Sequence, residues 1–386
     1  MQKKIGILAV RTLNYGSLLQ SYATQEILKD EGFDVEIISY KKTNKVKQAM
    51  RLLYWPMFKT QCKVVYKKLY IALIKKSLQP YFNRKYAALN QFIDNYFISS
   101  PEYIGRRNLI NGAANYDAFV LGSDQVWNPL NFGADYFSMS WIPDNILKVT
   151  YAASFGVSNL PKYQIKKTSK DLARIDYISV RERSGKKIVK ELTGREVPVV
   201  VDPTLLVDFR CWQKFAEKPL LKNQKYVMCY FLGTIASHRD TAKKLSKELG
   251  LPIVTLPHGD EIVKADFGFG DILPESVGPE EFVNLIANAE YVITDSFHGT
   301  VFSTLFCKRL IVFNRYEEST SSKESTNSRL SSILKLLGIE SRLFNSKKGV
   351  QKEMFEQIDY DAVHFRLNGL RMESKAYLTD ALNKLQ

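Results

Sequence analysis

The sequence predicts an α/β protein in which two Rossmann-like, doubly wound domains face a shared cleft. Short β-rich runs alternate with longer segments of helical periodicity, which is typical of βαβ units and parallel sheets. These units form two successive series, and 386 residues are enough for two domains. Ligands of such folds bind at the carboxyl ends of the strands, so the residues that follow the strands are the candidates for function.

The first domain is predicted to span residues 1–210. A helix is expected at 16–31, where apolar residues recur every three or four positions, and a basic helical insertion at 41–93. The apolar run near the N-terminus is too short for a signal peptide or a membrane span. Buried strands are predicted at 5–10, 35–39, 118–121, 149–153, 177–180 and 197–201.

The second domain is predicted to span residues 211–350, with the boundary inside 202–225. Residues 314–329 are rich in Ser, Glu and Lys and are expected to form a loop. Residues 351–386 are expected to form a helical tail that packs back on the first domain. Strands are predicted at 226–232, 253–256, 291–294 and 310–313, and helices at 240–249, 279–288 and 331–337.

Most of the positive charge lies in one segment without acidic residues. The net charge is +15, and residues 37–93 contain thirteen Lys and Arg but no Asp or Glu. Between residues 41 and 85 these cations alternate with aromatic residues in a helical pattern. The pattern fits a solvated helical face, a peripheral contact with an anionic membrane surface, or a protein-binding face. No nucleic-acid partner is expected, because no recognition motif accompanies the charge.

The cysteines and histidines show no spacing that predicts a disulfide framework or a metal site. No metal and no cofactor are therefore expected, and a reducing cytoplasm fits the four scattered cysteines. Three of the four histidines, His238, His258 and His364, are expected to be solvated or to lie in the core.

The clearest local signal is the segment from Asp295 to Thr300, which follows a predicted strand. Ser296 or Thr300 can cap a helix there, and the free N–H groups and dipole of a helix N-terminus favour an anion. Gly299 allows a ligand to approach the backbone, and His298 can donate to an anion or carry a proton. The alternative interpretation is a capped helix with a buried, hydrogen-bonded histidine.

Three further strands are also followed by polar residues. Asn14, Tyr15 and Gly16 come after the first strand and can bind a polar ligand, or can form an ordinary tight turn. Asp124 and Trp127 follow the strand at 118–121. There they can offer a carboxylate and an indole face to a sugar, or can act as a helix cap and a packed side chain.

Arg181 stands at the end of the strand at 177–180. Its guanidinium can form two parallel hydrogen bonds to a carboxylate or a phosphate. The alternative is a salt bridge to Glu182 or to another acidic residue.

The chain resembles the polysaccharide pyruvyl transferase family in five segments that occur in one order. The similarity spans about residues 4 to 345 and leaves out the basic insertion and the tail. The five segments are 7–23, 116–129, 179–182, 201–206 and 294–300.

The resemblance implies a glycosyltransferase-B-like fold and phosphoenolpyruvate as donor. It also implies a pyruvate ketal on a sugar of a cell-surface polysaccharide or its lipid-linked precursor. Some members carry an Arg-Leu-His triplet that helps to hold the donor, and the matching positions here are Ser296, Phe297 and His298. Arg181 matches a second donor-binding arginine, and Arg329 or Arg315 would have to replace the arginine that is missing at Ser296.

The chemistry requires a site that holds a multiply charged anion, delivers one proton and accepts another. His298 is the expected proton carrier, and Asp124 or Asp295 could take the proton of the sugar hydroxyl. The expected donor-binding residues are Arg181, Ser296, His298, Gly299, Thr300 and Arg329, and the acceptor-binding residues Asn14, Tyr15, Gly16, Asp124 and Trp127.

Two alternatives remain at this point. One is a nucleotide-sugar-dependent glycosyltransferase of the same fold, whose helix N-terminus would hold a diphosphate. The other is a non-catalytic scaffold of polysaccharide assembly that docks on the membrane. In each case the protein is expected in the cytoplasm, with a peripheral position on the inner face of the membrane.

Overall fold

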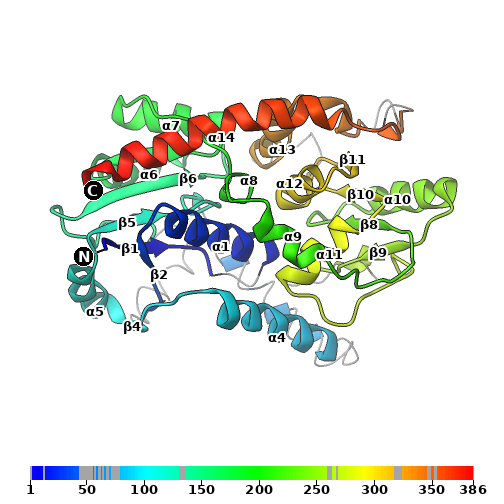
Figure 1. Ribbon diagram of the computed structural model, residues 1–386, viewed down its shortest axis with the longest axis horizontal. Helices are drawn as coiled ribbons and strands as arrows, with labels where there is room; N and C mark the ends of the chain where they lie inside the picture. Colours follow the sequence, from blue (N-terminus) through cyan, green and yellow to red (C-terminus); the bar gives the residue numbers. More distant parts are fainter. Residues whose placement is uncertain are drawn as a thin grey trace.

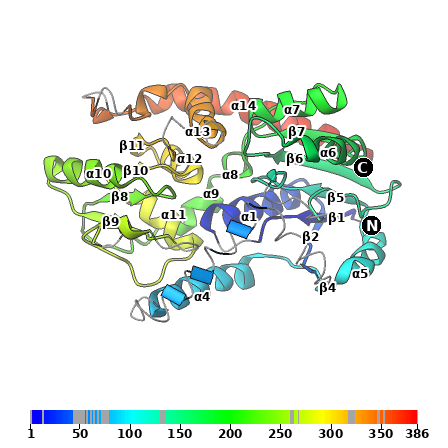
Figure 2. The same ribbon diagram turned by 180° about the vertical axis from the view of Figure 1, so that it is seen from behind.

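The molecule contains two parallel β-sheets that lie side by side along its long axis, each covered by helices (Figures 1 and 2). The computed structural model describes residues 2–11, 14–42, 55, 58–59, 62, 65–66, 69–70, 79–129, 136–258, 263–266, 268–316, 324–345, 349–351 and 354–385.

The first sheet has the strand order β2-β1-β5-β6-β7, and all its pairs are parallel. The predicted strand at 197–201 is reduced to a single bridge between Val180 and Val199. Pro198 lies beside this bridge and has no N–H to extend the ladder, which limits such a segment to the sheet edge. The strands are β1 (Lys4–Leu8), β2 (Asp34–Ile37), β5 (Ala118–Leu121), β6 (Leu147–Ala153) and β7 (Tyr177–Val180).

The second sheet has the order β11-β10-β8-β9 and is also parallel. In both sheets the strand order reverses once, between β1 and β5 and between β8 and β10, and ligands bind at such switch points. The strands are β8 (Val227–Tyr230), β9 (Ile253–Thr255), β10 (Tyr291–Thr294) and β11 (Arg309–Val312). The predicted domain boundary at 202–225 lies between the last strand of the first sheet and the first strand of the second.

The helices pack against the sheets through buried apolar residues. The loop predicted at 314–329 is shorter than expected, because a helix already begins at Glu324. Helices of the first half are α1 (Tyr15–Asp30), α5 (Gly105–Gly112), α6 (Lys162–Ala173) and α7 (Arg183–Thr193). Those that follow are α8 (Pro203–Leu206), α9 (Arg210–Ala216), α10 (Ala236–Leu249), α11 (Pro279–Ala287), α12 (Phe297–Leu305) and α13 (Glu324–Leu337).

The C-terminal helix α14 (Tyr360–Leu382) connects the two halves along one side of the molecule (Figure 1). Near its start, the Tyr360 hydroxyl donates to the carbonyl of Lys308 in the second half. Further along, the Ser374 hydroxyl accepts a hydrogen bond of 3.0 Å from the N–H of Val201 in the first half. The tail therefore packs on the first domain but begins on the second.

Helix α4 (Gln79–Tyr96) connects the two halves on the opposite side (Figures 1 and 2). In the sequence it lies between the two strands of a short parallel pair on the first half, β3 (Tyr40–Lys41) and β4 (Tyr103–Ile104). The Lys85 ammonium donates to the carbonyl of Pro257 at 3.1 Å, and Arg84 donates to that of Glu275 at 3.1 Å. The basic insertion thus ends in a helix that bridges the cleft, while most of residues 43–78 lie outside the described residues.

Candidate active site

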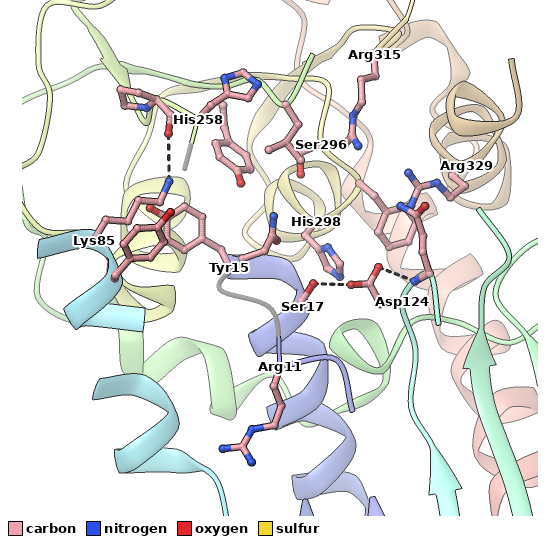
Figure 3. Close-up of a pocket in the computed structure, with 17 residues that line it drawn as sticks. Arg11, Tyr15, Ser17, Lys85, Asp124, His258, Ser296, His298, Arg315 and Arg329 are labelled. Carbon is pink, nitrogen blue, oxygen red and sulfur yellow. Dashed lines mark hydrogen bonds between the residues drawn. The ribbon is translucent and has the colours of Figure 1, made fainter. Parts of the chain in front are cut away.

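A cavity of about 720 Å³ lies between the two halves, where the switch points of both sheets meet (Figure 3). Among the described residues that line it are four Arg and Lys side chains, Arg11, Lys85, Arg315 and Arg329, but only one carboxylate, that of Asp124. A cavity with this excess of positive charge attracts anions.

His298 is the second residue of α12 and lies at the centre of the cavity wall. Ser296 caps the helix, since its hydroxyl accepts from the N–H of Gly299 at 3.2 Å. The His298 Nε2 atom lies 3.8 Å from a carboxylate oxygen of Asp202 in the first half. Gly16 makes room for the ring, because a Cβ at that position would lie 2.0 Å from the His298 Nδ1 atom. The imidazole therefore crosses from the second half into the first.

Asp124 follows β5 and faces His298 in the cavity. Its backbone has φ 80°, a conformation that side chains other than glycine rarely adopt and that recurs at functional sites. Its carboxylate accepts from the Ser17 hydroxyl at 2.5 Å and from the Gln125 N–H at 2.8 Å. Burial opposes ionisation, but Arg181, His298 and these hydrogen bonds outweigh it and lower the pKa of Asp124. The carboxylate is therefore ionised and held in one orientation.

Arg181 lies behind the cavity wall rather than on it. It donates to Asp202 at 2.8 Å and to the Ser123 hydroxyl at 3.3 Å, and its side chain is 3% exposed. The Phe297 ring, which does line the cavity, covers the guanidinium at 4.4 Å. Arg181 therefore positions Asp202 beneath His298, and its contact with the donor stays a prediction.

Arg315 and Arg329 lie on the cavity beside His298 (Figure 3). The two terminal nitrogens of Arg329 lie 2.8 and 3.1 Å from the side-chain amide of Gln125 and can donate to its oxygen when that oxygen faces Arg329. Burial, together with the positive charges of Arg315 and Arg181, lowers the pKa of Arg329 to about 9. An anion bound here would reduce the electrostatic repulsion between Arg329 and the other two arginines.

Two predicted residues, Asp295 and Trp127, have structural contacts and do not line the cavity. Asp295 is fully buried, and its carboxylate accepts from the N–H groups of Leu232 at 2.6 Å and Gly233 at 2.8 Å, so it closes the turn after β8. The Trp127 ring packs on Phe155 with the centroids 5.0 Å apart, and Trp127 does not line the cavity. The sequence shows that these residues follow strands, but not which way their side chains turn.

Gly299 and Thr300 also lie away from the cavity lining. Gly299 is required for packing, because a Cβ there would lie 2.6 Å from the Thr294 hydroxyl oxygen. The Thr300 hydroxyl donates to the Ser296 carbonyl within the helix at 3.0 Å. Of the four predicted residues from 296 to 300, only Ser296 and His298 therefore reach the cavity.

Asn14 and Tyr15 line the cavity and also build the start of α1. The Asn14 side chain accepts from the N–H of Gly16 at 3.0 Å, which caps the helix. Tyr15 is 1% exposed and stacks on Phe282 of the second half, with centroids 4.9 Å apart. These residues fix the contact between the two halves as well as one wall of the cavity.

The sequence predicted a solvated or core position for His258, but this residue lines the cavity three positions after the end of β9. Its Nδ1 atom lies 2.7 Å from a carboxylate oxygen of Asp266, and its backbone N–H donates to the same oxygen at 3.0 Å. Arg239 donates to the other oxygen at 2.6 and 3.0 Å. The sequence signal that could have identified His258 is its position after a strand, since Asn14, Asp124 and His298 also follow strands.

Within the described part of the chain, no group of His, Cys, Asp and Glu side chains is arranged to hold a metal ion. In the same residues, no helix has the length and apolar character needed to cross a bilayer.

Solved structures with the same fold include two sugar-nucleotide epimerases. The UDP-GlcNAc 2-epimerase of Neisseria meningitidis, bound to UDP-GlcNAc, is 10% identical, and the match covers 99% of this chain and 100% of that one with a TM-score of 0.53. A Listeria monocytogenes protein assigned as a UDP-N-acetylglucosamine 2-epimerase is 11% identical, with 98% and 97% covered and a TM-score of 0.51. The predicted pair of Rossmann-like domains, of the glycosyltransferase-B type, is thereby confirmed.

Sequence comparisons identify the family. No curated protein matches the chain. The family model described as polysaccharide pyruvyl transferase matches residues 14–316, which is more than half of the chain and includes the elements that carry Asp124, Asp202 and His298. The chain therefore belongs to the polysaccharide pyruvyl transferase family.

Proposed function

We propose that this protein transfers the enolpyruvyl group of phosphoenolpyruvate to a sugar of a cell-surface polysaccharide or of its lipid-linked precursor, forming a pyruvate ketal. The observation that carries the proposal is the cluster of Arg315 and Arg329 beside His298 at the N-terminus of α12, with Arg181 behind it. Phosphoenolpyruvate carries a phosphate and a carboxylate on the same carbon, and planar guanidinium groups bind both kinds of anion.

The reaction begins with protonation of the methylene carbon of phosphoenolpyruvate, which leaves a cation at the neighbouring carbon. A sugar hydroxyl forms a C–O bond at that carbon and loses its proton. The C–O bond to phosphate then breaks, and a second hydroxyl closes the ketal ring as it loses its own proton. Of the two hydroxyl protons, one balances the proton added to the methylene carbon and the other leaves with phosphate.

His298 and Asp124 supply the two proton-handling groups in this scheme. His298 lies on the cavity wall beside Arg315 and Arg329 and can act as the general acid that delivers the proton. Asp202 at 3.8 Å compensates the positive charge of the protonated ring. The ionised Asp124 carboxylate stabilises the cation at the ketal carbon and can take up a hydroxyl proton.

Phosphoenolpyruvate is expected to raise the melting temperature, since a ligand that binds only the folded state stabilises it. Replacing Arg329 with Met should weaken phosphoenolpyruvate binding about 10- to 100-fold, the usual loss for a hydrogen bond to a charged group. Titration calorimetry measures the dissociation constant.

Arg342→Met is the matched control, because Arg329 and Arg342 are both 6% exposed but only Arg329 lines the cavity. Equal dissociation constants for the Arg329 and Arg342 variants would contradict the placement of the donor. A stabilisation by UDP-GlcNAc that exceeds that by phosphoenolpyruvate would favour the nucleotide-sugar glycosyltransferase alternative. Polysaccharide assembly that continues unchanged after loss of the cavity side chains would favour the non-catalytic scaffold.

We further propose that the segment 41–85 holds the enzyme on the inner face of the membrane, where lipid-linked acceptors lie. Most of this segment is outside the described residues. Five of its described apolar side chains, all between residues 55 and 69, support the proposal because they are exposed: Trp55 62%, Phe58 42%, Val65 54%, Tyr66 55% and Leu69 54%. Aromatic and apolar side chains among lysines suit a membrane interface, where each cation contributes up to about 1 kcal/mol.

Binding to anionic vesicles is expected to exceed binding to neutral vesicles and to fade as salt is raised from about 0.1 M to about 1 M. Co-sedimentation measures the fraction of the protein that is bound to the vesicles. Binding should be lost when five lysines of the segment are changed to Glu: Lys63, Lys67, Lys68, Lys75 and Lys76. The matched control reverses five exposed lysines elsewhere: Lys162, Lys166, Lys170, Lys243 and Lys247. Equal binding by the two variants would overturn the proposal.

A further inference from the structure

A surface of the first half combines cations with exposed apolar side chains. It is formed by the end of β4 and one face of α5, and we call it the β4–α5 patch: Ile104, Arg106, Arg107 and Ile110. We propose that this patch is a second contact with an anionic membrane surface, in addition to the segment 41–85. The inference rests on the proposed membrane position of the enzyme and not on its donor or its reaction.

The apolar part of the β4–α5 patch is open to solvent. Ile104 is 51% exposed and Ile110 is 37% exposed. Among the described residues before position 160, each strongly exposed large apolar side chain lies between residues 55 and 110. These side chains belong either to the segment 41–85 or to the stretch from 98 to 110 that ends in α5. Exposed apolar surface that is concentrated in this way marks an interaction site.

Cations lie beside the isoleucine of α5. Arg106 and Arg107 come four and three positions before Ile110, so both are its neighbours on the surface of the helix. Leu109 points inward and is buried. Helix α5 contains no acidic residue, and Glu102 is the only one between residues 97 and 116. Positive charge among apolar side chains is the composition that binds an anionic bilayer surface.

The β4–α5 patch is continuous with the basic segment. Strands β3 and β4 are parallel, and Lys41 is paired with Ile104, so these two side chains lie next to each other on one face of the strand pair. Both residues are exposed. Lys41 is also the first cation of the segment 41–85. The patch therefore begins where the proposed membrane-binding segment leaves the sheet.

The patch also lies on the side of the molecule to which the basic segment returns. The segment ends in α4, and α4, β4 and α5 lie along one edge of the molecule in both views, with α14 along the opposite edge (Figures 1 and 2). A bilayer at the edge formed by α4, β4 and α5 would meet the patch as well as the end of the segment. Two separated contacts would fix the orientation of the enzyme on the lipid, which a single contact does not.

Vesicle co-sedimentation tests the inference with a triple variant and a matched control. Vesicles of phosphatidylcholine alone are compared with vesicles that also contain phosphatidylglycerol. The α5 variant removes two charges and one isoleucine of the patch: Arg106→Gln, Arg107→Gln and Ile110→Ser. The control on α6 removes the same groups from a helix away from this edge, where Ile165 is 40% exposed. Its changes are Lys162→Gln, Lys166→Gln and Ile165→Ser.

We expect the α5 variant to bind phosphatidylglycerol vesicles about 5- to 30-fold more weakly than the wild type, the loss for two cations near an anionic surface. The α6 control should bind as the wild type does. Ile104→Ser, which lies outside the helix, should weaken binding in the same direction as the α5 variant. Thermal unfolding should show that all three variants are folded, because each altered side chain is exposed.

Equal binding by the α5 variant and the α6 control would overturn the inference, whatever the five-lysine variant of the segment 41–85 does. Equal binding of the wild type to neutral and anionic vesicles would also overturn it. Weak binding by the α5 variant together with full binding by the five-lysine variant would support the patch and contradict the proposal for the segment. The two failures are therefore distinguishable.

Discussion

Replacing His298 with Ala is expected to lower turnover at least about 100-fold and to leave the protein folded. The expected loss is the usual scale for removing a general acid–base group. The fold should persist, because His298 lies at a cavity and at the start of a helix that Ser296 caps. Phosphate release from phosphoenolpyruvate measures turnover, and thermal unfolding measures the fold. A variant that keeps more than about a tenth of the activity would contradict the proton-transfer role.

The same histidine can be displaced without being replaced. A methyl group at position 16 would lie 2.0 Å from the His298 Nδ1 atom, so Gly16→Ala must move the ring away from Asp202 and Asp124. Turnover should fall although the imidazole is still present. Gly369→Ala in α14 is the matched control, because it introduces the same group where no atom lies within 4 Å. Equal activity of the two variants would show that the position of the ring is unimportant.

Replacing Arg181 with Met is expected to destabilise the protein by about 3–5 kcal/mol, the range for breaking a buried ion pair by removing one partner. Asp202 is 1% exposed and would keep a buried charge without the guanidinium that donates to it at 2.8 Å. The pair also positions the carboxylate that faces His298, so turnover should fall as well. Urea denaturation measures the free energy of unfolding.

A double variant separates the ion pair from a general packing defect. Arg181→Met combined with Asp202→Asn removes both charges and should recover much of the lost stability without recovering turnover. Lys187→Met, which breaks an exposed pair with Glu191, should change stability little. A double variant that is less stable than Arg181→Met would show that the unpaired charge of Asp202 is not the cause of the lost stability.

The fold and the place of the site follow from local patterns in the sequence. Helical and strand periodicities alternate, so the parallel sheets and the functional strand ends could be predicted from short windows. Asn14, Asp124 and His298 were identified in this way, and all three line the cavity. The strand at 197–201 was predicted from its apolar residues, but Pro198 limits it to one bridge.

The roles of individual side chains depend on contacts between distant segments, which periodicity does not reveal. Asp295 follows a strand as Asp124 does, yet its carboxylate turns toward the N–H groups after β8. Arg181 meets a carboxylate from another segment, Asp202, and is covered by a ring of the second half. Lys85 reaches the cavity because α4 crosses the cleft, and the charge pattern of the insertion gave no sign of this.

The bridging position of α4 has a consequence for which sugar of a glycan is modified. The helix begins within the basic segment 41–85, has 18 residues and presents Lys85 to the cavity. At about 1.5 Å per residue it is roughly 27 Å long, with Lys85 about 9 Å from its first residue. With the basic residues that precede the helix bound to a bilayer, the length of the helix would fix the distance between the cavity and the lipid surface. The enzyme would then select a sugar by its distance from the anchor as well as by its chemical structure.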